Sequence, residues 1–431
     1  MFDRSRGLKV QRLILAVCLG ISGMGAASAQ TLEVIPNRVL MDESAVVRAS
    51  GLQPNEHISI QAELVDGKGN TWTSQAEFVV DAQGAIDTSK QAPEKGSYGE
   101  VSAMGLIWSM KPQEKHVSSY QPPRDQGTQI IHFRLMRNGQ GVANALMEQL
   151  GIAQEVQQIK VEGQLHGVLF LPKTKDRRPG VLVVGGSEGG MPRGKAAWLA
   201  SRGYVALALA YFRYEDLPSQ LENIPLEYFG TALAWMMQRP EILADRIAVM
   251  GTSRGGELAL QLGSMYPQIK AVVAYVPANV RGPACCRDIR VPAWTWQGQP
   301  LAFTNPRVLP GNAGAMHAAI AVEHTHGPIL LISGENDGVW ESTRMANAVV
   351  TRLKESHFPY PYDHLKYPHA GHRAGRPEIV PTWHGTVKNS TSRREENLGG
   401  NAQGDAQSSL DAIPKVLEFL HASLQDHTAE K

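Results

Sequence analysis

Two patterns of apolar residues divide the chain near residue 158. Before this point, apolar residues occur in short β-rich runs. Clusters of Gly, Pro, Asn and Asp separate these runs, for example at residues 51–55, 66–70 and 81–84. This punctuation is typical of an antiparallel β-sandwich. We predict strands at 46–49, 58–62, 78–80 and 130–135, a loop at 121–127, and a helix-like segment at 144–150.

After residue 158 the apolar runs are continuous and alternate with segments of helical character. This alternation predicts a mostly parallel sheet with helices on both faces. The last helix contains Pro414, which is tolerated only near the first turn, so this helix is expected to begin no earlier than about residue 410. The predicted strands are 168–171, 181–184, 205–209, 247–250, 271–275 and 329–332, and the predicted helices are 195–201, 228–237, 345–354 and 410–424.

A G-x-S-x-G sequence centred on Ser253 lies between a predicted strand and a predicted helix. This is the setting of a nucleophile elbow, in which a tight turn presents the serine at the top of a sheet. Gly251 and Gly255 supply the room that such a turn needs. The alternative is a serine that merely occupies a glycine-rich helix entry. The strand and helix around the motif favour the nucleophile.

A serine nucleophile needs a base, and the base needs an orienting acid. In hydrolases with this elbow the chain order is serine, then acid, then histidine. His372 lies in a late loop and is the predicted base, with His369 as its nearest competitor. Asp337 follows the strand at 329–332 and is the predicted acid. Glu335 and Asp363 are the alternative acids. If they are not catalytic, Glu335 is a turn residue and Asp363 is a solvated charge at a strand end.

The oxyanion that forms during acyl transfer needs two backbone N–H donors. The N–H of Arg254 is one candidate, because it follows the nucleophile. The second is expected in the glycine-rich loop at 185–190, at Ser187 or Glu188. This loop could instead bind a phosphate. It lacks the Lys-Ser/Thr ending of a P-loop and the spacing of a dinucleotide-binding sequence, so the oxyanion role is favoured.

The N-terminus resembles an export signal. Basic residues precede an apolar run at 13–24, and Ala27-Ser28-Ala29 fits the small-residue cleavage rule. We predict a signal peptide at 1–29, a mature chain that begins at Gln30, and export to the periplasm or the medium. An uncleaved anchor is the alternative. No later segment is long and apolar enough to span a membrane.

The charge balance of the chain narrows its possible partners. The 431 residues include 42 Lys and Arg against 41 Asp and Glu, a balance that argues against nucleic acid as a partner.

The mature chain is expected to contain few cysteines. Removal of the leader would leave only Cys285 and Cys286. Adjacent cysteines rarely bond to each other, so we expect no structural disulfide. A redox or metal role for this pair is the weaker alternative, because no other Cys and no His at ligand spacing lies nearby.

Several segments in one order resemble the family of acyl-CoA thioesterases and bile acid-CoA:amino acid N-acyltransferases. The resemblance spans nearly the whole mature chain, and the second half is also similar to dienelactone hydrolase. The matching segments are 40–44, 105–110, 185–190, 210–218, 224–229, 251–256, 327–334, 340–342 and 367–372.

This resemblance implies an N-terminal immunoglobulin-like β-sandwich at 30–145 and a C-terminal α/β-hydrolase domain at 146–431. It also implies a triad of Ser253, Asp337 and His372. The amino-acid acyltransferases of the family carry cysteine as nucleophile, so the serine here resembles the hydrolase branch. Three features depart from the family: His369 where glycine is usual, Asn336 where many members have aspartate, and the export signal.

Together these observations predict a serine hydrolase that acts on a small-molecule acyl thioester or activated ester. The chemistry requires no metal and no cofactor. Because coenzyme A is intracellular, an exported member is expected to accept more than coenzyme A thioesters. An exported carboxylic-ester hydrolase or acyltransferase is the closest alternative. A catalytically degenerate exported binding protein is a further one, against which the intact order of the three residues argues.

Overall fold

The computed structural model describes residues 29–285, 288–305, 313–388 and 394–425. The predicted signal peptide lies almost wholly outside the described residues, as does Cys286. Among the described residues, no helix combines the length and apolar character needed to cross a membrane.

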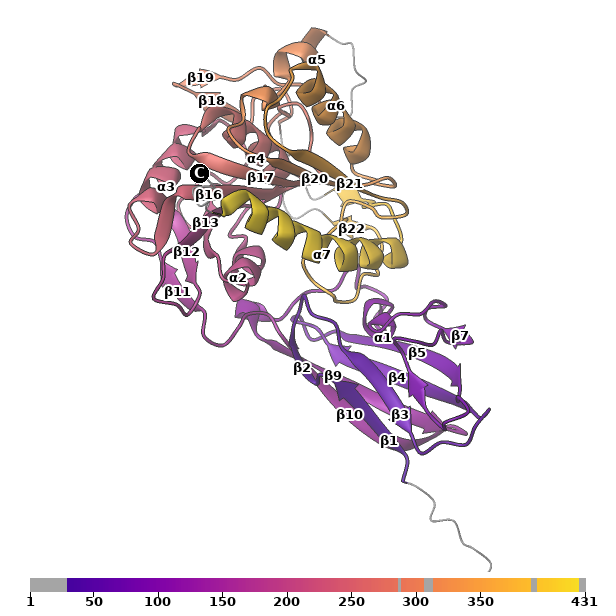
Figure 1. Cartoon of the computed structure of the whole chain (residues 1–431). Coiled ribbons are helices and arrows are strands. Elements are labelled where there is room, and N and C mark those ends of the chain that lie inside the picture. The colour runs from indigo at the N-terminus through magenta and orange to yellow at the C-terminus, as the bar shows by residue number, and fades with distance from the viewer. Residues whose placement is uncertain (1–28, 286–287, 306–312, 389–393, 426–431) are drawn as a thin grey trace, which may run out of the picture.

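The N-terminal part of the chain forms two β-sheets (Figure 1). One sheet has the strand order β1-β3-β6, and the other has the order β2-β10-β9-β4-β5-β7, with β8 beside β5. The elements are β1 (Thr31–Ile35), β2 (Arg38–Leu40), β3 (Val46–Ser50), β4 (His57–Val65), β5 (Thr71–Val79), β6 (Ile86–Asp87), β7 (Lys95–Gly96), α1 (Gly105–Trp108), β8 (Lys111–Pro112), η1 (Arg124–Gln126), β9 (Thr128–Arg137) and β10 (Gln140–Leu150).

Alternation of apolar and polar residues explains this unit. In β4, buried and more exposed positions alternate along the whole strand, and Ile58, Ile60 and Leu64 are among the buried side chains. Residues of β1, β3, β4 and β9 contribute to one continuous apolar core, so the two sheets share an interior. Antiparallel pairing of β4 with both β5 and β9 holds the larger sheet together.

The helix-like segment predicted at 144–150 is a strand, and this prediction was wrong. Its Ala, Leu, Met and Glu residues favour helices individually. Antiparallel pairing of β10 with β9 along nearly its whole length overrides that preference. Because β10 continues to Leu150, the boundary predicted between residues 145 and 146 falls inside this strand.

The C-terminal part of the chain is built on an eight-stranded sheet of order β11-β12-β14-β13-β16-β17-β20-β21. β11 and β12 run antiparallel to their neighbours, and the other strands are parallel. The elements are β11 (Gln157–Lys160), β12 (His166–Leu171), β13 (Arg178–Val184), α2 (Arg193–Ser201), β14 (Val205–Ala210), β15 (Ile224–Pro225), α3 (Glu227–Met237), β16 (Ile242–Thr252), α4 (Arg254–Met265), β17 (Ile269–Tyr275), β18 (Trp294–Trp296), β19 (Gln299–Pro300), α5 (Ala313–Ala318), η2 (Val322–His324), β20 (Ile329–Gly334), α6 (Ser342–Glu355), β21 (Tyr362–Tyr367), β22 (Val387–Lys388), β23 (Glu395–Glu396) and α7 (Ala402–Leu424).

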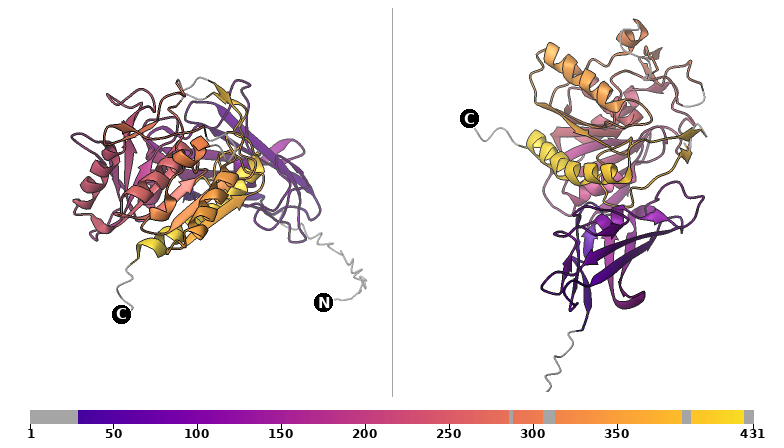
Figure 2. Two further views of the ribbon diagram at one scale, coloured as in Figure 1. Left: turned by 90° about the horizontal axis from the view of Figure 1, so that it is seen from above. Right: turned by 90° about the vertical axis from the view of Figure 1, so that its right-hand side faces the viewer.

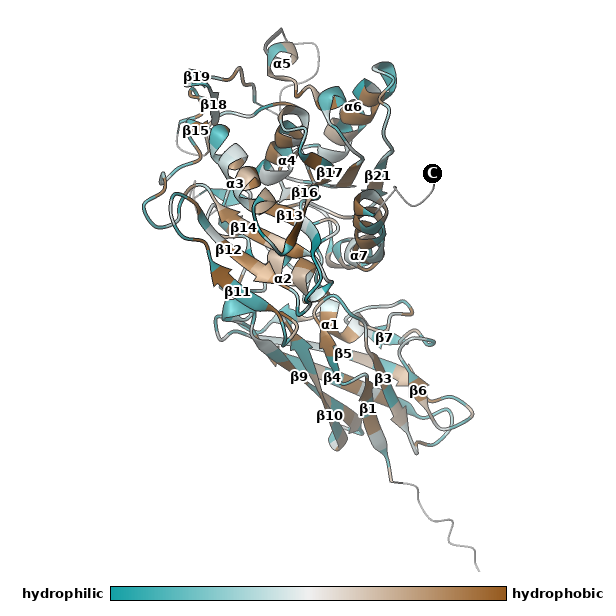
Figure 3. Ribbon diagram, turned by 60° about the vertical axis from the view of Figure 1, so that its left-hand side comes forward, coloured by the Kyte–Doolittle hydropathy of each residue, from teal (hydrophilic) through white to brown (hydrophobic). Residues whose placement is uncertain are grey.

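The central strands of this sheet are apolar on both faces, as Figure 3 shows for β13, β14 and β16. Helices α2 and α7 cover one face, and α3, α4 and α6 cover the other. This is the layered arrangement that continuous apolar strands predict, because each strand must be buried from two sides. The predicted α/β-hydrolase architecture is therefore present in this half of the chain.

Helix α7 begins eight residues earlier than predicted, at Ala402 rather than at residue 410, and contains Pro414 in its interior. The Asn401 side chain caps its N-terminus by accepting the backbone N–H of Gly404 at 2.8 Å. Gly404 and Asp405 in the first turn are buried against the loop that carries His372. These tertiary contacts offset the backbone hydrogen bond that the proline removes.

The two parts of the chain meet along the face of the sheet that carries α2 and α7 (Figures 1 and 2). The buried carboxylate of Asp42 accepts the indole N–H of Trp198 at 2.8 Å and two N–H groups of Arg202 at 2.6 and 2.7 Å. On the far side of the contact, the backbone N–H of Thr382 donates to the carbonyl of Trp108. The charge-assisted hydrogen bonds between Asp42 and Arg202 fix the relative orientation of the two parts as well as adding stability.

Cys285 is disulfide-bonded, so the expectation of no structural disulfide was wrong at this position. The other two cysteines of the chain, Cys18 and Cys286, lie outside the described residues.

Candidate active site

Ser253 stands between the end of β16 and the first residue of α4. Its backbone has φ 59° and ψ −120°, a strained conformation for a residue with a side chain. The glycines of the motif make this turn possible. A Cβ on Gly251 would lie 1.9 Å from the carbonyl oxygen of Gly255, and one on Gly255 would lie 2.4 Å from that of Gly185. The local sequence therefore produces the sharp strand–turn–helix geometry of a nucleophile elbow.

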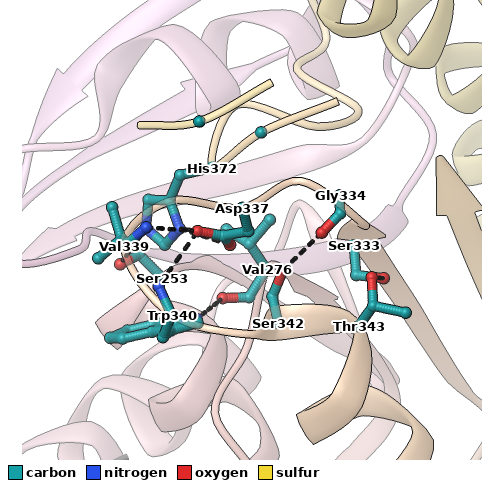
Figure 4. Close-up of polar contacts among 12 residues, drawn as sticks. Ser253, Val276, Ser333, Gly334, Asp337, Val339, Trp340, Ser342, Thr343 and His372 are labelled. Atoms are coloured by element: carbon teal, nitrogen blue, oxygen red, sulfur yellow. Dashed lines mark hydrogen bonds and ion pairs between the residues drawn. The ribbon is translucent and has the colours of Figure 1, made fainter. Parts of the chain in front are cut away.

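Three side chains from distant loops converge at this elbow (Figure 4). Ser253 Oγ lies 2.8 Å from His372 Nε2. On the other side of the imidazole, His372 Nδ1 lies 2.8 and 3.0 Å from the two carboxylate oxygens of Asp337. This is the connectivity of a nucleophile, a base and an orienting acid. The structure thus brings together the three residues that the chain order predicts.

The surroundings of Asp337 hold its carboxylate in one orientation. The side chain has no exposed surface. Its Oδ1 accepts the backbone N–H of Val339 at 2.9 Å and that of Trp340 at 3.3 Å. The Trp340 ring packs edge-on against the imidazole of His372, with centroids 5.2 Å apart, and its indole N–H donates to the Val276 carbonyl (Figure 4). These contacts leave the carboxylate directed at Nδ1 of the histidine.

The alternative acids and the alternative base lie elsewhere. Asp363 is exposed on β21, where its carboxylate accepts the backbone N–H of His364. Glu335 is also exposed. His369 is exposed and has φ 63°, a conformation that favours glycine. Its departure from the usual glycine therefore carries a backbone cost but does not place its side chain in the triad.

Helix α7 positions the histidine loop, which sequence reasoning did not anticipate. Asp405 is buried, and its Oδ1 accepts the backbone N–H of Gly371 at 2.8 Å. The backbone N–H of His372 itself donates to the carbonyl of Leu398 at 2.8 Å. The sequence signal was weak, because the contact joins residues more than thirty positions apart and the helix start was placed too late.

The loop predicted to stabilise the oxyanion lies beside the nucleophile. A Cβ on Gly186 would sit 3.5 Å from Ser253 Cβ and 3.5 Å from a carboxylate oxygen of Glu188. Tyr211 donates its hydroxyl to the carbonyl of Gly185 at 2.7 Å and so anchors the start of the loop. Ser187 and Arg254, the other candidate donors, flank the same region, since Arg254 opens α4. The assignment of their N–H groups to an oxyanion stays a prediction.

A buried ion pair lies behind the elbow. Arg254 Nε is 3.1 Å from Glu257 Oε2, and both side chains are almost fully buried. Glu257 also accepts the indole N–H of Trp294 at 2.8 Å and the backbone N–H of Gly282 at 3.1 Å. This network connects the first turn of α4 to the segment around Gly282, so it stabilises the position of the turn that carries the nucleophile.

Lys195 is a further feature that the sequence did not reveal. Its ammonium donates to the hydroxyl of Thr252, the residue before the nucleophile, and lies 4.5 Å from the centre of the Tyr275 ring. Burial, together with the positive charge of Arg376, lowers the pKa of Lys195 to about 7. The sequence places Lys195 in a helix but gives no indication that its charge points toward the elbow.

One group of metal-ligating side chains occurs in the part of the chain that the structure describes, and it comprises His166, Glu215 and Asp216. Each ring nitrogen of His166 already faces a different carboxylate, at 3.0 and 3.2 Å. Glu215 also pairs with Lys160. No triad residue belongs to this group, so it has no place in the chemistry of the elbow.

Comparison with known proteins links these features to described relatives. The model "BAAT / Acyl-CoA thioester hydrolase C terminal" matches residues 224–426, and "Acyl-CoA thioester hydrolase/BAAT N-terminal region" matches residues 42–163. Acyl-coenzyme A thioesterase 6 of Mus musculus is 30% identical over 92% of this chain and 97% of its own length. Bile acid-CoA:amino acid N-acyltransferase of the same species is 28% identical over 79% of this chain and 86% of its own.

Solved structures with a similar fold are more distant. A putative dienelactone hydrolase from Klebsiella pneumoniae is 17% identical, covers 62% of this chain and 97% of its own, and gives a TM-score of 0.40. An α/β hydrolase from a deep-sea metagenome library is 19% identical, covers 62% of this chain and 99% of its own, and gives a TM-score of 0.39. With both family models matched and a 30% identical relative aligned nearly end to end, the chain belongs to the family of acyl-CoA thioester hydrolases and bile acid-CoA:amino acid N-acyltransferases.

Proposed function

We propose that this protein is a serine hydrolase of acyl thioesters and activated esters, acting through an acyl-Ser253 intermediate. One observation carries the proposal. The hydroxyl of Ser253, the imidazole of His372 and the buried carboxylate of Asp337 form a continuous hydrogen-bonded chain on a strained elbow. Membership of a family that contains acyl-coenzyme A thioesterases supports thioesters as the substrate class.

In the first half of the reaction, Ser253 Oγ attacks the acyl carbonyl carbon and its proton passes to His372 Nε2. Asp337 accepts the hydrogen bond from Nδ1–H of His372, which fixes that tautomer and stabilises the imidazolium. Backbone N–H groups near Arg254 and the 185–190 loop would stabilise the tetrahedral oxyanion. Collapse breaks the carbon–sulfur or carbon–oxygen bond, and Nε2 returns the proton to the leaving thiol or alcohol.

In the second half, His372 Nε2 takes a proton from water while that water attacks the acyl-serine carbonyl. Collapse releases the carboxylic acid and returns the proton to Ser253 Oγ. An acyltransferase would use an amine in place of water at this step. The serine nucleophile favours hydrolysis here, since the acyltransferases that the sequence resembles use cysteine. An exported ester hydrolase or acyltransferase remains the alternative function.

We also propose that the protein is exported after cleavage at Ala29 and that its two-sheet N-terminal unit is an immunoglobulin-like domain. The export proposal rests on the basic and apolar segments at the N-terminus. An exported enzyme would meet little coenzyme A, so its range is expected to include short thioesters and aryl esters. Sequencing of the mature N-terminus tests export. If the mature chain begins at Met1, the export proposal is wrong.

Replacement of the nucleophile tests the mechanism directly. Ser253→Ala is expected to lower kcat by about 10⁶-fold, as removal of a triad nucleophile does in serine hydrolases. Ser356→Ala, an exposed position at the end of α6, is the matched control and should keep full activity. A fluorophosphonate should modify the wild type once, at Ser253, as mass spectrometry of peptides would show. Retained turnover in Ser253→Ala, or no adduct on folded wild-type protein, would contradict the proposal and favour a binding protein.

A further inference from the structure

Val276, the first residue after β17, has a strained backbone in the interior of the protein. Its φ is 40°, and the residue is fully buried. A positive φ is rare for a side chain that branches at Cβ, because the branch crowds the backbone. Among the residues that the structure describes, no other Val, Ile or Thr has one. Strain of this kind persists only where the surroundings enforce it, and it is frequent at functional sites.

The peptide unit before Val276 is fixed on both sides. Its carbonyl, which belongs to Tyr275, accepts the backbone N–H of Ser253 at 2.9 Å. Its N–H, which belongs to Val276, donates to the carbonyl of Ile332 on β20 at 2.7 Å. The nucleophile is therefore hydrogen-bonded directly to the segment that carries the strain.

The next carbonyl, that of Val276 itself, accepts the indole N–H of Trp340 at 3.1 Å (Figure 4). Trp340 also donates its backbone N–H to Asp337 and packs edge-on against the ring of His372. Rotation about the backbone of Val276 sets the angle between its two flanking peptide units, because each unit is planar. The positive φ therefore directs one carbonyl to the serine and the following one to the tryptophan.

The side chain of Val276 packs against the histidine loop. It forms a small buried cluster with Ala370 and Ala374, which lie two residues before and two residues after His372. Glycine would adopt the same φ without strain, but it would leave these two alanines without support. A branched side chain at a positive φ supplies both the directions of the two carbonyls and the packing against the loop.

Gly256 leaves the room that this bend needs. A Cβ on Gly256 would lie 2.7 Å from the carbonyl oxygen of Tyr275 and 3.3 Å from Cα of Pro277. The first turn of α4 therefore packs directly on the strained segment. The nucleophile elbow itself requires only Gly251 and Gly255, so this contact accounts for the third glycine of the 251–256 segment.

We propose that Val276 is a positioning residue that holds the nucleophile, the acid loop and the histidine loop in register. The strain at its φ is the consequence of making all these contacts from one residue. The proposal rests on the serine hydrolase function described above, and it adds a residue that is not itself one of the reacting groups. Small displacements of such groups are enough to lower turnover strongly.

Val276→Ala separates positioning from ordinary core packing. The change removes the support of the histidine loop but relieves strain, because alanine has no branch at Cβ. For an aryl ester, kcat should fall by about tenfold to a hundredfold with KM nearly unchanged. Val273→Ala is the matched control, since Val273 is equally buried inside β17. It should keep wild-type kcat well below its Tm, yet lose more Tm than Val276→Ala, because no relief of strain offsets its lost packing.

Val276→Thr reverses this pattern. Threonine keeps the branched shape, so this variant should recover most of the kcat that Val276→Ala loses. Its buried hydroxyl should lower the Tm below that of Val276→Ala. The less stable variant is then the more active one, which a purely structural role for Val276 does not produce. If Val276→Thr is as inactive as Val276→Ala, the shape of the side chain does not position the loop and the proposal is overturned.

Trp340→Phe tests the connection through the carbonyl. Phenylalanine keeps a ring beside His372 but cannot donate to Val276, so kcat should fall by about two- to tenfold. Combined with Val276→Ala, the total loss should be smaller than the product of the two single losses, because both changes disturb one set of contacts. Losses that simply multiply would overturn the shared role of Val276.

Crystal structures of wild type, Val276→Ala and Val273→Ala decide the question without turnover. In Val276→Ala alone, the histidine loop should move so that Ser253 Oγ and His372 Nε2 are no longer 2.8 Å apart. Identical loops in all three structures would overturn the proposal whatever the activities. Absence of ester and thioester hydrolysis in wild type would instead refute the proposed function, and the positions of the loops would still decide on Val276.

Discussion

Ser253 and His372 meet at 2.8 Å but are held in place by different means. The serine owes its position to a strand, two glycines and a helix within about ten residues of chain. The histidine owes its position to Leu398 and to Asp405 on the last helix, through contacts between segments remote in sequence. A nucleophile whose position depends on neighbouring residues can be predicted from a short motif. A base held by distant contacts can be located only by its order in the chain.

The largest effect is expected for the acid. All three candidate carboxylates lie between Ser253 and His372 in the chain, so only the place of Asp337 after the strand at 329–332 and its match to the family favour it. Asp337→Asn should lower kcat by about 10³–10⁴-fold with the fold intact, because the amide permits the wrong tautomer of His372. Glu335→Gln and Asp363→Asn are matched controls on exposed residues and should stay within about tenfold of wild type. Steady-state kinetics with circular dichroism of each variant gives the result. A large loss in Asp363→Asn and a small one in Asp337→Asn would reverse the assignment.

The predictions from sequence divide in the same way: features set by the local sequence were predicted correctly, and features set by distant contacts were not. Continuous apolar runs gave the central strands of the large sheet, because burial on both faces leaves little freedom in composition. The helix predicted at residues 144–150 was wrong because pairing with β9 overrides helix propensity. The predicted start of α7 was too late because tertiary contacts offset the effect of Pro414. In the site, chain order together with position in loops identified Asp337 and His372, which the structure places beside Ser253.

The supporting residues of the site were missed for a physical reason. Asp405 and Glu257 act through buried hydrogen bonds to backbone groups far along the chain. Lys195 acts through its position on α2 above the elbow strand. A lysine or an acid in an ordinary helix pattern predicts a solvated face, so composition gives no sign of these roles. Such contacts become visible only when the segments are brought together.

An intermediate effect on kcat is expected at Asp405, the residue that holds the histidine loop in place. Asp405→Ala removes the acceptor of the Gly371 N–H and should displace the histidine loop, with kcat reduced by about ten- to a hundredfold and KM nearly unchanged. Asp405→Asn keeps an oxygen acceptor and should recover most of the activity. Glu418→Ala, on the exposed face of the same helix, is the matched control.

The temperature dependence of kcat separates positioning from general destabilisation at Asp405. A displaced histidine loop should lower kcat at every temperature, whereas an enzyme that is only less stable should match wild type well below its Tm and lose activity earlier on heating. If Asp405→Ala retains full kcat, the histidine loop does not depend on α7, and the contrast between the two residues loses its basis.

The smallest effect concerns the strand that leads to Asp337. On β20, Ser333 Oγ lies 2.7 Å from Nε2 of His364, whose Nδ1 faces the Asn347 side-chain oxygen at 3.1 Å. Burial lowers the pKa of His364 to about 4, with a further contribution from the charge of Lys366. The folded protein therefore holds this imidazole neutral, while the unfolded chain takes up a proton below about 6.5. The stability that follows from the neutral form is complete above pH 6.5 and is lost as the pH falls toward 4.

Thermal unfolding between pH 7 and pH 4.5 checks this expectation. The Tm of wild type should fall by a few degrees more than that of His364→Gln, whose amide has no proton to gain. Solvent around this partly exposed group screens the charge and keeps the difference small. His132→Gln, an exposed histidine on β9, is the matched control and should follow the wild-type curve. Parallel curves for wild type and His364→Gln would show that the histidine contributes nothing to the pH dependence of stability.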